Sequence, residues 1–123
     1  MKTFITVIAC LLWVSVAAPS HARNIKTVGS GPTINFDPAM IPLEHQESYQ
    51  IMGKKCTTCH GMDRIVLTIL TGKAQVTKQP FDREQAAGYG IRLIRMHNTG
   101  LKKEEIRDVI RMLQWLIDEK NKH

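Results

Sequence analysis

The pentapeptide Cys56-Thr57-Thr58-Cys59-His60 constrains this chain more than any other stretch. Its pattern, C-x-x-C-H, is the attachment sequence of c-type haem. Two thiols at this spacing can each form a thioether to one vinyl group of haem, and the imidazole that follows can bind the iron through Nε2. We therefore predict one covalent haem c on Cys56 and Cys59, with His60 as an axial ligand of the iron.

Other sites use parts of the same pattern. A structural zinc site needs four ligands, but no cysteine follows Cys59 and the other histidines are scattered. A thioredoxin-like C-x-x-C requires a βαβ setting, whereas the flanking pattern is helical. A disulfide between Cys56 and Cys59 stays open as an alternative, although it leaves His60 unexplained.

The N-terminus has the pattern of an export signal. Lys2 precedes a mostly apolar stretch from Phe4 to Ala18, and small residues occupy positions 20 and 22. We predict a secretory signal peptide over residues 1–22 and a periplasmic protein. The apolar stretch is short for a membrane span, so that an uncleaved membrane anchor is the less favoured alternative. Cys10 would leave with the signal peptide.

The remaining residues suffice for one small domain. Residues 23–43 contain glycines and prolines without periodicity, which predicts an extended N-terminal arm. This arm could wrap the fold or extend from it, and the pattern does not distinguish the two. Residues 44–123 are expected to form the folded domain.

Helical patterns predict a mainly α domain. A first helix is expected over residues 44–55, and Asp82 is a good N-cap for a helix that reaches residue 96. The apolar run 65–70 fits a short buried helix or a strand, and residues 73–80 are expected to form a polar loop. The last helix has a continuous apolar stripe: Ile106, Val109, Ile110, Leu113, Leu116 and Ile117.

The helix after Asp82 carries two expectations. Its apolar positions Ala87, Ile91 and Ile94 fall on one face. Its glycines, Gly88 and Gly90, weaken a helix and indicate a close approach to haem or to another helix. Asn98 or Gly100 is suited to end this helix in a left-handed conformation.

A methionine opposite the histidine raises the reduction potential of haem iron. Met52 and Met62 lie too close to the attachment sequence to reach the opposite face of haem, and Met112 belongs to the last helix. Met96 ends a helix and precedes a glycine-containing loop. We predict Met96 as the second axial ligand, with His97 as the alternative.

The order of these features resembles the monohaem class I c-type cytochromes, in particular short periplasmic domains, over residues 44–119. The resemblance is carried by Cys56–Ile65, Met96, Leu101, Glu104–Ile106 and Leu113–Leu116. It implies a helical fold around one haem, in which the first and last helices cross and one haem edge stays exposed. It also implies that Cys56 and Cys59 hold the haem and that His60 and Met96 bind the iron.

The chain departs from this family at several positions. Ser48 and Met52 replace a glycine and an aromatic residue where the helices cross, and His97 replaces a proline after the distal methionine. The family commonly has a proline soon after the attachment site, whose carbonyl orients the proximal histidine, but the first proline here is Pro80. Another acceptor must therefore hold the Nδ1–H group of His60.

The expected function is one-electron transfer between redox partners, some of them membrane-bound, rather than enzymatic catalysis. One alternative is a haem with an open or His-ligated sixth site for small-ligand binding, sensing or peroxidase-like chemistry; another is a haem subunit of a larger dehydrogenase complex. The net charge of +6 favours acidic partners, and no pattern supports nucleic-acid binding. Four lysines could form a basic rim for docking, or be ordinary solvated side chains: Lys54, Lys55, Lys73 and Lys78.

Overall fold

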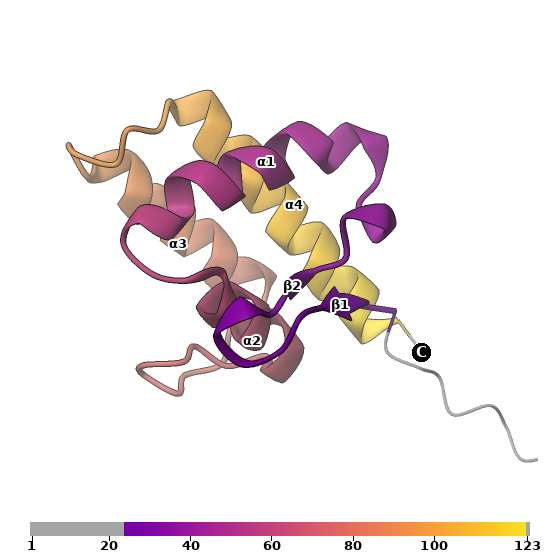
Figure 1. Cartoon of the computed structure of the whole chain (residues 1–123). Helices are drawn as coiled ribbons and strands as arrows, with labels where there is room; N and C mark the ends of the chain where they lie inside the picture. Colours follow the sequence, from indigo (N-terminus) through magenta and orange to yellow (C-terminus); the bar gives the residue numbers. More distant parts are fainter. Residues whose placement is uncertain (1–23, 123) are drawn as a thin grey trace, which may run out of the picture.

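The computed structural model describes residues 24–122, and the predicted signal peptide over residues 1–22 lies outside them. The described part is mainly α, as predicted, with a short antiparallel pair of strands (Figure 1). Its helices are α1 (Gln46–Lys55), α2 (Met62–Thr71), α3 (Arg83–Arg95) and α4 (Lys103–Asn121), and its strands are β1 (Thr27–Val28) and β2 (Asn35–Phe36). Four 3₁₀ turns connect them: η1 (Gly31–Thr33), η2 (Pro38–Met40), η3 (Leu43–His45) and η4 (Cys56–Thr58).

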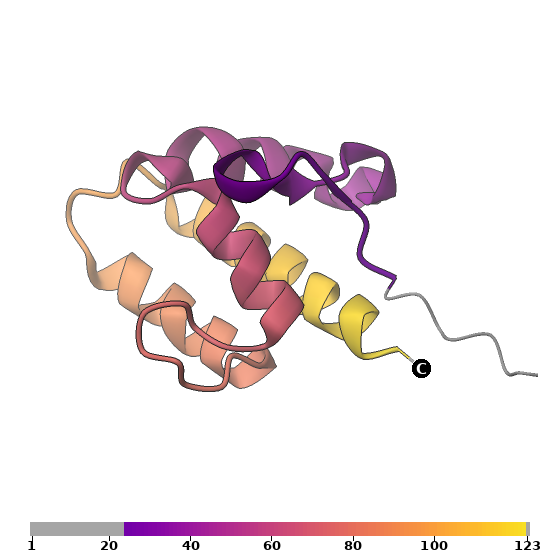
Figure 2. The ribbon, with the colours of Figure 1, turned by 60° about the horizontal axis from the view of Figure 1, so that its bottom comes forward.

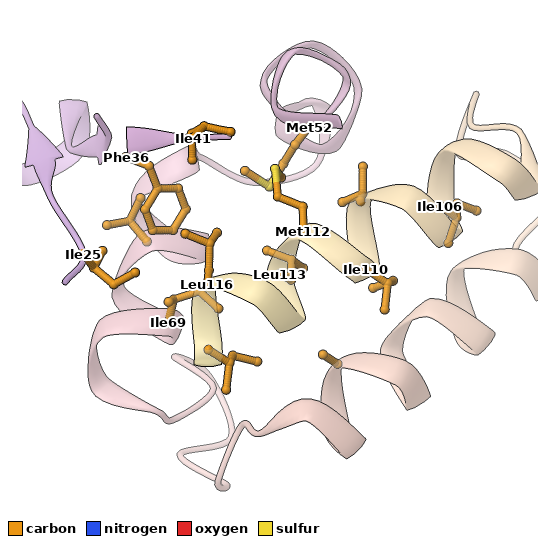
Figure 3. Close-up of a cluster of buried hydrophobic side chains, with 14 residues drawn as sticks. Ile25, Phe36, Ile41, Met52, Ile69, Ile106, Ile110, Met112, Leu113 and Leu116 are labelled. Atoms are coloured by element: carbon orange, nitrogen blue, oxygen red, sulfur yellow. The ribbon is translucent and has the colours of Figure 1, made fainter. Parts of the chain in front are cut away.

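Helix α4 is the centre of the hydrophobic core. Every residue of its predicted apolar stripe is buried, and Met112 is buried beside them. Helix α1 crosses and contacts α4 (Figure 1). Figure 3 shows Met52 of α1 and Met112 of α4 pointing toward each other in the core. Both side chains are fully buried, so that two flexible thioethers fill the space where the helices cross.

Helix α3 begins as predicted, but a different face of it is buried. The carboxylate of Asp82 accepts a hydrogen bond of 2.9 Å from the backbone N–H of Gln85, which confirms the N-cap. The buried positions are Ala86 and Gly90. On the predicted apolar face, Ala87 and Ile94 are half-buried, whereas Ile91 is 53% exposed. Helix α3 packs on α4 through its smallest residues, which lets the two helices approach closely.

The apolar run after the attachment sequence is helical. Helix α2 extends from Met62 to Thr71 and buries Val66 and Ile69. Gly72 ends it with φ of +66°, a left-handed conformation in which glycine carries no Cβ penalty. The following loop over residues 73–80 is closed by a bridge between Lys73 and Pro80. In Figure 2 this loop connects the end of α2 to the beginning of α3.

The segment before α1 is part of the core. Ile25, Phe36 and Ile41 are buried with the helical residues, and Figure 3 shows Phe36 and Ile41 beside Leu116 and Met52. The hydroxyl of Tyr49 in α1 donates a hydrogen bond of 2.9 Å to the carbonyl of Phe36. Of the two arrangements left open for this arm, the structure shows the one in which it packs against the fold.

Candidate functional site

The residues singled out by the sequence meet at one cavity. Its volume is about 560 Å³, within the range of small-molecule and cofactor sites. It is lined by residues of the attachment turn, α1, α2, α3, α4 and the loop 73–80. Figure 2 shows how the backbone of these segments is arranged. Its lining includes Cys56, Cys59, His60 and Met96, but not His97.

The attachment turn η4 follows α1 without a break. The hydroxyl of Thr57 donates a hydrogen bond of 2.7 Å to the carbonyl of Gly53, and the hydroxyl of Thr58 donates one of 2.9 Å to the carbonyl of Lys55. These two bonds satisfy carbonyls that a helix end leaves without a partner. The two variable residues of the pentapeptide therefore hold the turn against α1.

The two cysteines are free thiols in different surroundings, so the disulfide alternative is not what the structure has. Cys56 is half-buried and Cys59 is exposed. Burial raises the pKa of the Cys56 thiol, and the neighbouring Cys59 adds to the rise. Cys56 is therefore a neutral thiol at neutral pH, and its thiolate, the nucleophilic form, is scarcer than in an exposed cysteine.

Tyr89 lines the cavity together with Cys56 and Cys59. It projects from α3 and is 37% exposed. Burial is the largest cause that raises the pKa of Tyr89, and the charges of Cys56 and Cys59 add to it, while Arg92 opposes them. No sequence motif assigns Tyr89 to the site; the glycines on either side of it are the one available signal.

His60 has an acceptor for one ring nitrogen. Its Nδ1 lies 3.2 Å from the carbonyl oxygen of Gly61. A carbonyl oxygen can only accept, so this contact favours the tautomer with the proton on Nδ1 and leaves the lone pair of Nε2 available. The acceptor expected in place of a proline is therefore supplied by the next residue of the chain.

Met96 follows the last residue of α3. Its backbone is extended (φ −78°, ψ 134°), and its N–H donates to the carbonyls of Arg92 and Leu93 at 3.2 and 3.1 Å. The expected left-handed cap is wrong: Gly100 does have φ of +68°, but it lies within the loop before α4. The thioether of Met96 lines the cavity and is 57% exposed.

The other methionines are placed differently. Met52 also lines the cavity, although it is fully buried in the core against α4. Met40, Met62 and Met112 are absent from the lining. Among the methionines of residues 24–122, Met96 is therefore the one that combines a place on the cavity with an exposed side chain.

Lysines of the expected basic rim fall into two groups. The ammonium of Lys55 lies 2.9 Å from each carboxylate oxygen of Glu105 and is thus neutralised within the fold. Lys54, Lys73 and Lys78 are exposed.

Residues 24–122 contain no group of three histidine, cysteine or acidic side chains arranged to hold a metal ion. In the same part of the chain, every helix is too short or too polar to cross a membrane. Comparison with protein-family models, with curated protein sequences and with solved structures finds no match to this chain.

Proposed function

We propose that this chain is a monohaem c-type cytochrome of the periplasm that carries single electrons between redox partners. The observation that carries the proposal is the position of the C-x-x-C-H sequence: both thiols and His60 line the same cavity as Met96. In the sequence Met96 is far from the other three residues, so their meeting at one cavity is a property of the fold.

The chemistry of the cavity supports a bound haem. Apolar atoms dominate its lining, and three of its apolar or aromatic side chains are left partly in solvent. Val76 is 73% exposed, and Tyr89 and Met96 contribute further accessible surface. Clustered exposed apolar side chains mark binding sites. A planar apolar group in the cavity would cover them, and the residues present therefore fit haem.

Each residue of the site has a defined role in this proposal. Cys56 and Cys59 hold the haem through thioethers, and His60 binds the iron through Nε2 while Gly61 fixes the ring. Met96 offers a thioether as the second ligand. The bound haem would supply a one-electron iron couple. Because Cys59 and Met96 are both exposed, the cavity is open to the surface where a redox partner could approach.

The proposal is tested by producing the chain in a host with a functional cytochrome c maturation system. We expect haem absorbance that resists extraction into acidic organic solvent. The variant with Cys56→Ser and Cys59→Ser should lose this covalent haem, whereas Thr57→Ser, which changes the same turn but no thiol, should retain it. A wild-type protein without covalent haem would refute the proposal.

A second candidate is a haem protein with an open sixth position. The position of Met96 favours it, because its extended backbone lies beyond the last residue of α3, where no helix fixes the thioether next to the iron. Rapid binding of carbon monoxide to the ferrous protein would support this candidate. Slow or absent binding would support a six-coordinate electron carrier.

A further inference from the structure

The charged residues of the cavity are all of one sign. The chain has 11 acidic residues, and none of them lines the cavity. Its charged lining consists of Lys55, Arg64 and Arg92. A cavity with cationic side chains and no carboxylate is suited to a ligand that itself carries negative charge.

The three cations differ in their partners. Lys55 is neutralised by Glu105 at 2.9 Å. Arg64 and Arg92, in contrast, have no carboxylate within 4.0 Å among residues 24–122. Elsewhere in the described chain, Arg83 pairs with Asp118 and Arg111 pairs with Asp108. The two cavity arginines therefore have guanidinium groups available to a ligand.

Arg64 and Arg92 come from two different helices of the site. Arg64 follows His60 by four residues and lies in α2. Arg92 precedes Met96 by four residues and lies in α3. Both arginines line the cavity that His60 and Met96 also line, so their guanidinium groups can contact a ligand placed there.

We infer that Arg64 and Arg92 bind the two carboxylates of the haem. The planar fork of a guanidinium matches a carboxylate with two parallel hydrogen bonds. The inference rests on the proposed function and extends it. It names the residues that bind the two carboxylates, which are the groups of the haem that the thioethers do not hold. Two positive charges near the iron also favour its reduced form.

The test compares matched variants of the covalent haem protein. Arg64→Gln and Arg92→Gln remove one charge each, and Arg64→Lys with Arg92→Lys keeps both charges but loses the fork geometry. Arg95→Gln is the control, because Arg95 is an exposed neighbour on α3 that does not line the cavity. The measurements are the infrared difference spectrum between reduced and oxidised protein, in the carboxylate region, and the midpoint potential.

We expect each Gln variant to shift the carboxylate bands and to lower the midpoint potential. A double Gln variant, which combines Arg64→Gln with Arg92→Gln, should lower the potential further. The double Lys variant should keep most of the potential but shift the bands, and Arg95→Gln should change neither. Covalent haem with wild-type carboxylate bands in the double Gln variant would overturn this inference and leave the proposed function intact. A wild-type chain without covalent haem would overturn both.

Discussion

Gly90 of α3 lies directly against the side chain of Ile110 of α4. A Cβ atom placed on Gly90 would lie 2.7 Å from Cγ1 of Ile110, whereas one placed on Gly88 would have no atom within 4 Å. Gly90 is therefore the point of close contact between the helix that presents Met96 and the helix that forms the core. Of the close approaches expected for these glycines, the one between helices is found at Gly90.

Substitution of these two glycines should have opposite effects on stability. Gly90→Ala should lower the free energy of unfolding by about 1–3 kcal/mol, because the added methyl group overpacks the α3–α4 contact. Gly88→Ala should raise it by about 0.5–1 kcal/mol, because alanine is the better helix former. Denaturant unfolding measures both. Equal effects of the two substitutions would contradict the close contact at Gly90.

Glu105 should make stability depend on pH. A hydrogen bond from Lys55 is the largest cause that lowers the pKa of Glu105, and one from the backbone N–H of Lys102 adds to it. A carboxyl group with a lowered folded pKa stabilises the fold above its unfolded pKa, and this stability is lost as the pH falls through the folded pKa. Glu105→Gln should therefore be less stable than wild type at pH 7, with a difference that shrinks below the ordinary value of 4.5.

Urea unfolding at a series of pH values measures this dependence. The control is Asp108→Asn, which removes a solvent-exposed ion pair to Arg111 on the same helix. It should have a smaller effect, because exposed pairs contribute little. A difference between Glu105→Gln and wild type that stayed constant from pH 7 to pH 3 would count against the role of the carboxylate charge.

Phe36 should be as important for stability as a residue of the helical core. Its side chain is fully buried in the hydrophobic core, so Phe36→Ala should lower the free energy of unfolding by about 3–5 kcal/mol. Val28→Ala, in the paired strand but exposed, should change it by less than about 0.5 kcal/mol. Similar values for both variants would mean that the segment before α1 contributes little to folding.

Met96 and His97 should differ as iron ligands. Met96→Ala should abolish the weak long-wavelength absorption band of sulfur-ligated ferric haem and lower the midpoint potential, because a thioether ligand raises it. His97→Ala should leave both unchanged, since His97 does not line the cavity. Absorption spectroscopy and a redox titration measure these effects. Loss of the band in His97→Ala would reverse the assignment.

The two thiols of the haem-free protein should react at different rates. Cys59 is exposed, whereas Cys56 is half-buried and burial raises the pKa of its thiol. Alkylation by iodoacetamide at pH 8 should therefore modify Cys59 several-fold faster than Cys56, because the thiolate is the reacting form. Peptide mass spectrometry follows each site. In denaturant the two rates should converge, and a preference for Cys56 in the folded protein would contradict the difference in burial.

The sequence by itself determined the helical class, the N-cap at Asp82, the buried stripe of α4 and the C-x-x-C-H motif. These features are local or periodic: a cap depends on neighbours three residues away, and a stripe repeats with the helical turn. The prediction of a covalent haem also depends on a local feature, because it rests on five consecutive residues. Such features can be deduced from a sequence without knowing which elements meet.

The tertiary structure alone decided how the elements pack. It showed that α3 buries Gly90 rather than Ile91, because close approach to Ile110 requires a residue without a side chain. It placed Phe36 in the core and brought Tyr89, Arg64 and Arg92 to the wall of the cavity. These placements depend on contacts between residues far apart in the chain, and helical periodicity carries no information about the partner that a face will meet.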